Sequence, residues 1–280
     1  MKRKLFTTLL FILFLIAAQG QNQGDTSSLK KAKGMIVLPS MVYFNLTNGQ
    51  SATREITITN RLPEKKQYKV YLGDWERDSM GDHKYSPANS ISRSCARWIK
   101  LSRDVIELEP DSSAVISVRM QMPDSAEAIQ EMKWAMVFIQ LVNEEKAHKT
   151  EKDITQQVIY NFRMGVHVYQ TPPNLKRVYL SMLSFKNIVN KKDSILYQIA
   201  CLNEGTQQLK VKCNFIMTNL STGEKTKLPQ QDFPMFPGQK RLVNYLVPNG
   251  LKPGKYSILA TADGGDDMPL QASQAEVDIQ

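Results

Sequence analysis

Apolar and polar residues alternate with a period of two along most of the chain after residue 33. The alternation is regular in residues 53–60 and, apart from one apolar doublet, in residues 114–120. Such a pattern is typical of β-strands that bury one face. Residues 134–142 are apolar at nearly every position, as in a strand with both faces covered. A helical turn is expected only in residues 125–132, so the pattern predicts an all-β chain.

Turn-forming residues separate these runs. Glycine tolerates positive φ and proline fixes φ, so both favour turns. Further strands are expected at residues 178–180, 195–199, 209–213 and 242–246, and Tyr256 is expected to pack inward from a strand near the end. Many short strands between frequent turns indicate a sandwich or a barrel. The clearest turns are Asn48-Gly49, 79–82, 109–111, 203–205, Pro237-Gly238 and Pro253-Gly254.

Two adjacent prolines, Pro172 and Pro173, interrupt the pattern near the middle of the chain. Proline lacks the N–H that a central strand needs, and the residue before it is pushed towards an extended conformation. We therefore place a boundary here, between residues 34–173 and 174–280, and both parts have the usual size of a sandwich domain. The expected fold is two immunoglobulin-like β-sandwich domains in tandem.

The first twenty residues have the pattern of a secretory signal peptide. Residues 2–4 are basic, residues 5–18 are almost wholly apolar, and Ala18 and Gly20 suit a cleavage site before Gln21. The apolar run is short for a membrane-spanning helix, although an uncleaved anchor is the alternative. Residues 21–33 are polar and are expected to form a flexible tail. We expect a periplasmic protein without a transmembrane segment in its mature part.

Charge and cysteine content narrow the function classes. The net charge is +9, and it falls to +6 without the signal peptide, which favours an anionic partner. No basic run is interleaved with aromatic residues, so a nucleic-acid partner is not expected. Three cysteines are too few for a disulfide framework. We assign Cys201 and Cys213 to one hairpin, where they are either small buried residues or, in an oxidising compartment, a disulfide.

The sequence contains no arrangement that indicates catalysis, so no enzymatic activity and no cofactor are expected. The histidines at 83, 148 and 167 have no carboxylate or cysteine at the spacing of metal ligands. Phosphate-binding loops and nucleophile elbows are absent from the sequence. The tryptophans at 75, 98 and 134 are expected to pack in the core.

The most ligand-like run lies near the C-terminus. Two glycines and three carboxylates, from Asp263, Asp266 and Asp267, could surround a calcium ion with oxygen ligands. The spacing differs from that of an EF-hand loop. A solvated turn between the last two strands is the alternative, and we expect no metal here.

Several features of the first domain follow one another in a distinctive order. A strand ending at residues 42–44 precedes the strand 55–60, and a Leu108-x-Pro110 turn leads into a strand that ends at Arg119. The domain closes with Tyr169-x-x-Pro172. This order resembles the N-terminal domain of PapD-like periplasmic pilus chaperones. The second domain, which includes the phrase 264–266, resembles their partner domain, so the resemblance covers most of the mature chain.

The resemblance implies that one strand binds a client polypeptide. Such chaperones add a strand to the open edge of an incomplete subunit; main-chain hydrogen bonds supply affinity and alternate apolar side chains supply fit. The matching segment, residues 158–168, is apolar at every even position. The even positions alternatively face the domain's own core. The residues expected to contact the polypeptide are Val158, Tyr160, Phe162, Arg163 and Met164.

The family's pair of basic residues, which binds the client's terminal carboxylate, is not matched. Alignment on Phe44 puts the first at Met41, and alignment on Tyr169 puts the second at Val166. Arg163 is near, but an odd spacing from Val166 puts it on the other face of the strand. The expected function is a periplasmic chaperone or assembly factor for secreted or surface protein subunits. The alternative is a structural or adhesion-linked envelope protein held in a cell-surface complex.

Overall fold

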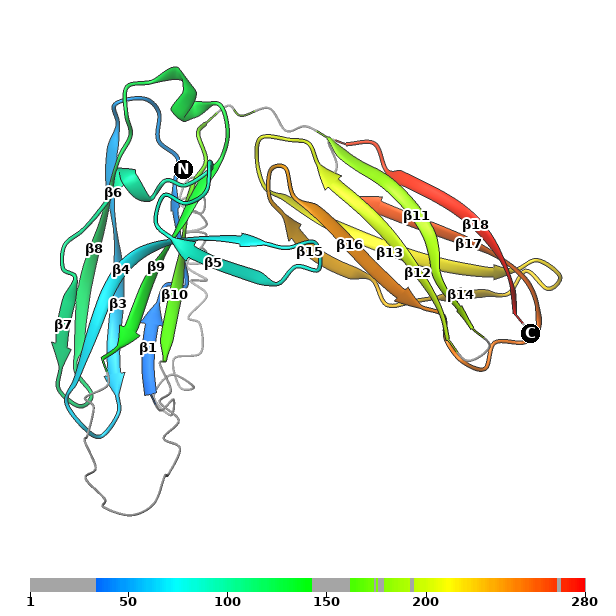
Figure 1. The fold of residues 1–280 in the computed structure, drawn as a ribbon, viewed down its shortest axis with the longest axis horizontal. Coiled ribbons are helices and arrows are strands. Elements are labelled where there is room, and N and C mark those ends of the chain that lie inside the picture. Colours follow the sequence, from blue (N-terminus) through cyan, green and yellow to red (C-terminus); the bar gives the residue numbers. More distant parts are fainter. Residues whose placement is uncertain are drawn as a thin grey trace, which may run out of the picture.

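Two β-sandwiches follow one another along the chain, as the sequence predicts (Figure 1). The computed structural model describes residues 34–142, 162–173, 175, 179–191, 194–265 and 268–279. The expected signal peptide (1–20) and tail (21–33) lie outside the described residues, as do Val158, Tyr160, Asp266 and Asp267. None of the helices in the described ranges is long and apolar enough to cross a membrane.

The first sandwich pairs a sheet of order β1-β3-β8-β6 with a sheet of order β2-β10-β9-β4-β5, in which β7 also pairs with β4. The short helix η2 (Ala126–Ile129) falls in the segment where a helical turn is predicted. The other elements are β1 (Gly34–Leu38), β2 (Met41–Phe44), β3 (Ser51–Arg61), β4 (Lys66–Arg77), β5 (His83–Pro87), η1 (Ala96–Trp98), β6 (Ile99–Leu101), β7 (Val105–Leu108), β8 (Ser113–Gln121), β9 (Lys133–Leu141) and β10 (Arg163–Gln170).

The alternating residues of the sequence fill the core between these sheets. Ile56 on β3 lies opposite Ile116 on β8, and both are fully buried. Strand β9 is central in the other sheet, between β10 and β4, and residues 134–139 are buried on both faces. Both faces of β9 are covered, one by the core and the other by aromatic side chains, which explains why its residues are apolar at nearly every position.

A buried asparagine closes one turn in each sandwich. Asn60 donates from Nδ2 to the Leu108 carbonyl (3.0 Å), and its Oδ1 accepts from the Tyr68 hydroxyl (3.0 Å). Asn203 donates from Nδ2 to the Met235 carbonyl (2.9 Å) and accepts from the Gly205 N–H (2.9 Å). The hydrogen bonds offset the cost of removing these polar groups from water, so the asparagines fix the turns.

The second sandwich pairs a sheet of order β11-β12-β16 with a sheet of order β14-β13-β17-β18, in which β15 also pairs with β13. Tyr256 packs inward, as predicted, and its hydroxyl donates to the Lys252 carbonyl (3.0 Å). The strands are β11 (Leu180–Lys191), β12 (Ser194–Asn203), β13 (Leu209–Asn219), β14 (Lys225–Lys227), β15 (Gln231–Met235), β16 (Lys240–Leu246), β17 (Gly254–Asp263) and β18 (Gln271–Ile279).

One sequence prediction about the cysteines is wrong. Cys201 lies on β12 and Cys213 on β13, and these strands belong to different sheets. The residues between β12 and β13 cross from one sheet to the other, so the strands form no hairpin. Cys201 and Cys213 are unbridged and fully buried, and they meet across the sandwich.

The connection between the sandwiches runs from the end of β10 at Gln170 to the start of β11 at Leu180. Residues 174 and 176–178 lie outside the described part of the chain. The predicted boundary at residues 173 and 174 falls inside this connection and stays a prediction.

Candidate functional site: an open strand edge and an interdomain cleft

The chain changes sheets between β1 and β2. Residues 34–38 pair with β3 in one sheet, and after the cis peptide Leu38–Pro39 residues 41–44 pair with β10 in the other. Strand β2 runs parallel to β10 from the pair Met41–His167 to the pair Phe44–Gln170. It therefore covers only the C-terminal half of β10. No other strand of the described ranges pairs with this side of residues 163–166.

We call residues 163–166 of β10 the open edge. Two of these four residues turn their main-chain N–H and C=O groups towards the unpaired side of the strand. On one side of β10, the Leu141 N–H of β9 donates to the Phe162 carbonyl (3.0 Å). On the other side, the His167 N–H donates to the Ser40 carbonyl (3.0 Å). Main-chain groups alternate between the two sides of a strand. The N–H and C=O groups of Arg163 and Gly165 consequently point to the side on which the described residues supply no partner strand.

The side chains of β10 divide between two faces. Met164, Val166 and Val168 pack in the core of the first sandwich, which is the alternative considered for the even positions. Arg163 projects to the other face, where its guanidinium lies 4.4 Å from the Phe138 ring centroid and 5.0 Å from that of Tyr85. Such contacts between a cation and an aromatic ring stabilise the arginine in place.

The sequence-predicted residues are thus brought together only in part. Phe162, immediately before β10, is 52% exposed, and Met164 is half-buried. At the positions of the family's basic pair, Met41 is 46% exposed and Val166 is buried. Neither residue carries a charge.

The face of the sheet opposite the core carries an aromatic layer. Trp75 is at its centre and contacts the rings of His167 (centroids 4.6 Å apart) and His83 (5.0 Å). Glycines on the strands make room for the large side chains: a Cβ at Gly165 would lie 2.7 Å from Met136 Sδ. The members are Tyr43, Tyr71, Trp75, His83, Tyr85, Trp134, Phe138, His167 and Tyr169.

Two histidines of this layer are held in the neutral form. Burial, followed by the nearby His83 and the positive charge of Arg77, lowers the pKa of His167 to about 4. Burial and Arg77 also lower the pKa of His83. The two rings lie 5.6 Å apart, so a proton on one disfavours a proton on the other.

A phenylalanine of the second sandwich completes the aromatic layer. Phe236 is buried, and its ring lies 5.0 Å from Trp75, 5.1 Å from Trp134 and 6.0 Å from Tyr169. The turn 236–239 presents it: the Gln239 N–H donates to the Phe236 carbonyl (3.0 Å), and Gly238 has a φ of +74°. Proline followed by glycine with positive φ is the signature of a type II turn.

Main-chain hydrogen bonds also join the two sandwiches. The hairpin of β4 and β5 reaches the edge of β16, as Figure 1 shows, and the Leu242 N–H donates to the Ser79 carbonyl (2.7 Å). The Met132 N–H donates to the Thr206 carbonyl (2.7 Å). Arg241 packs directly on Gly81, where any Cβ would overlap its guanidinium.

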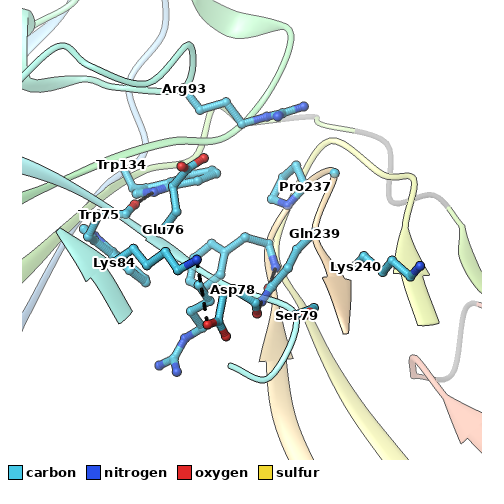
Figure 2. A pocket seen from close by; sticks show the side chains of 13 residues that line it. Trp75, Glu76, Asp78, Ser79, Lys84, Arg93, Trp134, Pro237, Gln239 and Lys240 are labelled. Carbon is cyan, nitrogen blue, oxygen red and sulfur yellow. Dashed lines mark hydrogen bonds and ion pairs between the residues drawn. The ribbon is translucent and has the colours of Figure 1, made fainter. Parts of the chain in front are cut away.

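A cleft of about 360 Å³ lies where the sandwiches meet (Figure 2). Its basic side chains outnumber its acidic ones, which are Glu76 and Asp78. Asp78 lies 4.0 Å from Lys84 Nζ, and its carbonyl accepts from Gln239 Nε2 (3.4 Å). The cleft therefore favours anionic groups by charge. Its basic residues are Arg77, Lys84, Arg93 and Lys240.

Other candidate chemistry has little support in the structure. Among the described residues, no group of three or more metal-ligating side chains comes together. Asp263 accepts a hydrogen bond from the Gly265 N–H (2.8 Å), as a turn residue does. Burial raises the pKa of the Cys95 thiol, so Cys95 does not form a nucleophilic thiolate.

Sequence reasoning missed the aromatic layer and Phe236. Tyr71, Gly73 and Trp75 occupy alternate positions on β4, so aromatic residues at period two on the nominally polar face were an available signal. The Pro237-Gly238 turn is predicted correctly. Nothing local to that turn indicates that the preceding phenylalanine inserts into the other sandwich.

Comparison with known proteins gives structural matches alone. No family model and no curated protein matches the chain. The class 5 fimbriae chaperone CfaA is 12% identical, with a TM-score of 0.43 over 87% of this chain and 98% of that chain. The E. coli chaperone DraB is 11% identical, with a TM-score of 0.42 over 89% and 98%. The CsuC–CsuE chaperone–tip adhesion subunit complex of Acinetobacter baumannii is 7% identical, with a TM-score of 0.41 over 75% of this chain and 89% of that chain. The chain is thus similar, over most of its length, to PapD-like fimbrial chaperones.

Proposed function

We propose that this protein is a periplasmic chaperone or assembly factor that binds secreted or surface polypeptides by strand addition along β10. The observation that carries the proposal is the open edge at residues 163–166, next to β2. A client strand placed there pairs with the main-chain groups of Arg163 and Gly165. The periplasmic location rests on the predicted signal peptide, and the binding involves no catalysis.

Pairing through main-chain groups recognises the extended conformation of a partner segment more than its side chains. Each hydrogen bond between main chains contributes about 1 kcal/mol net, so the two residues of the open edge alone give weak binding. The remainder of the affinity comes from apolar contact. Phe162 (52% exposed) lies at the start of the edge, and Met41 and Tyr43 are exposed on β2 beside it.

The cleft between the sandwiches adds electrostatic selectivity. Its surplus of basic side chains favours a client with an acidic segment or a terminal carboxylate. The aromatic layer joins the cleft to β10, because Trp75 lines the cleft and contacts His167 on β10.

Site-specific photo-cross-linking in the native periplasm tests this proposal. A photoreactive residue at Phe162 is expected to capture a secreted subunit, and one at Val115 is not. Val115 is the matched control, because it is 45% exposed on β8 of the other sheet. Capture at Val115 but not at Phe162 would contradict strand addition. If free client added before irradiation never reduces cross-linking at Phe162, the bound subunit does not exchange, which would indicate the structural envelope protein instead.

A further inference from the structure

Two thiols lie side by side in the centre of the second sandwich. Cys201 belongs to the sheet of β12, and Cys213 belongs to the facing sheet of β13. Both side chains are fully buried in the same core between the sheets, and the two thiol groups interact with each other there. The thiols are thus neighbours, although the residues come from opposite sheets.

The pair belongs to the apolar core of the second sandwich. Val211 and Phe215, the next inward-facing residues of β13, are fully buried, and the Phe215 ring stacks on that of Tyr245 (centroids 4.9 Å apart). A covalent bond between the facing sheets is an established way to stabilise immunoglobulin-type sandwiches. The third cysteine, Cys95, is buried in the first sandwich, and so it does not compete for either thiol.

We propose that Cys201 and Cys213 form a disulfide when the chain folds in an oxidising compartment, and that this bond ties the two sheets of the second domain. The proposal rests on the predicted export of the chain and is independent of client binding. It assigns the thiol pair to stabilisation of the domain that supplies Phe236 to the interdomain contact.

The reaction requires a disulfide-containing oxidant, such as oxidised glutathione or a disulfide oxidoreductase. The thiolate of one of the two cysteines attacks one sulfur of the oxidant's disulfide, which breaks that bond and releases one thiol. The thiolate of the other cysteine then attacks the sulfur of the first and expels the second thiol. Two electrons pass to the oxidant, and the two thiol protons end on the released thiols.

Because both thiols are inaccessible in the folded domain, the exchange takes place during folding, before the sheets close.

Refolding of the chain without its predicted signal peptide tests the proposal. The protein is refolded with oxidised and reduced glutathione, then denatured, alkylated without reductant and analysed by peptide mass mapping. The expected result is a linked pair of peptides containing Cys201 and Cys213, with only Cys95 alkylated. Three alkylated cysteines, or stable glutathione adducts on Cys201 or Cys213, would overturn the proposal.

Thermal unfolding with and without reductant gives a second readout. Reduction is expected to lower the Tm of the second domain by on the order of 10 °C, because the bond restricts the unfolded chain between Cys201 and Cys213. The Cys95→Ala variant is the matched control and should show the same decrease. A Tm that reductant leaves unchanged in both proteins would argue against the bond.

Discussion

Replacement of Phe236 by alanine should separate the two sandwiches without unfolding either. The ring is buried against three aromatic residues of the first sandwich, Trp75, Trp134 and Tyr169. It belongs to this interdomain cluster and to neither of the two sandwich cores. Its removal therefore acts on the contact between the domains.

The expected size follows from the contacts. Truncation of a buried phenylalanine costs about 3–5 kcal/mol, and each aromatic pair contributes about 0.5–1.5 kcal/mol. We take about 3 kcal/mol, because water can enter the space left at a domain boundary and limit the cavity cost. At about 1.4 kcal/mol for each factor of ten, the ratio of docked to undocked molecules falls by about two orders of magnitude.

Tryptophan fluorescence is the direct assay. Trp75 and Trp134 are buried under Phe236, so the Phe236→Ala variant should show red-shifted emission and stronger acrylamide quenching. Leu246→Ala is the control, because Leu246 is 58% exposed on β16 of the same sandwich. Quenching of Phe236→Ala equal to that of wild type, or an equal increase in Leu246→Ala, would refute the reasoning.

Three further changes test the site. Arg163→Pro removes the N–H at the open edge and should weaken client binding about tenfold in a titration with captured client. Arg163→Ala keeps this N–H and should bind as wild type. An equal loss of affinity in both variants would contradict main-chain pairing at Arg163. The pKa of His167 is about 4 in the folded protein and about 6.5 when unfolded, so the unfolded state takes up the proton first as pH falls. The free energy of unfolding should thus decrease by about 1–2 kcal/mol, after allowance for the partly exposed ring, as the pH falls from about 6.5 to about 4. Urea titrations of the His167→Asn variant should not show this decrease. If the variant loses as much as wild type, another group is responsible. Asp74 is fully buried and accepts hydrogen bonds from the Ser94 hydroxyl (2.6 Å) and the Ser90 N–H (2.7 Å). Asp74→Ala should therefore lower the free energy of unfolding of the first domain, measured in urea, by about 3 kcal/mol. A change near zero would show that water replaces the carboxylate.

The strands were predictable because their pattern is local. Alternation at period two identifies β3 and β8, and the continuous apolar run identifies β9. The sequence also predicts the type of fold and the turn at Pro237-Gly238. Each of these depends on residues within about ten positions of one another along the chain.

The features of the site depend on contacts between distant segments. The open edge exists because residues 34–38 pair with β3 while residues 41–44 pair with β10, and alternation does not reveal which sheet a strand joins. Phe236 is far in sequence from Trp75. The spacing of Cys201 and Cys213 predicts one hairpin, because short connections usually join paired strands. In this chain the connection crosses between the sheets.

Amide hydrogen exchange at single-residue resolution, in the free protein and in its complex with captured client, tests strand addition most directly. The Met164 and Val166 amides already pair with β9, so they should be protected in both states. The account predicts that the amides of Arg163 and Gly165 exchange fast in the free protein and slowly in the complex. Fast exchange of both amides in a fully bound complex would contradict it.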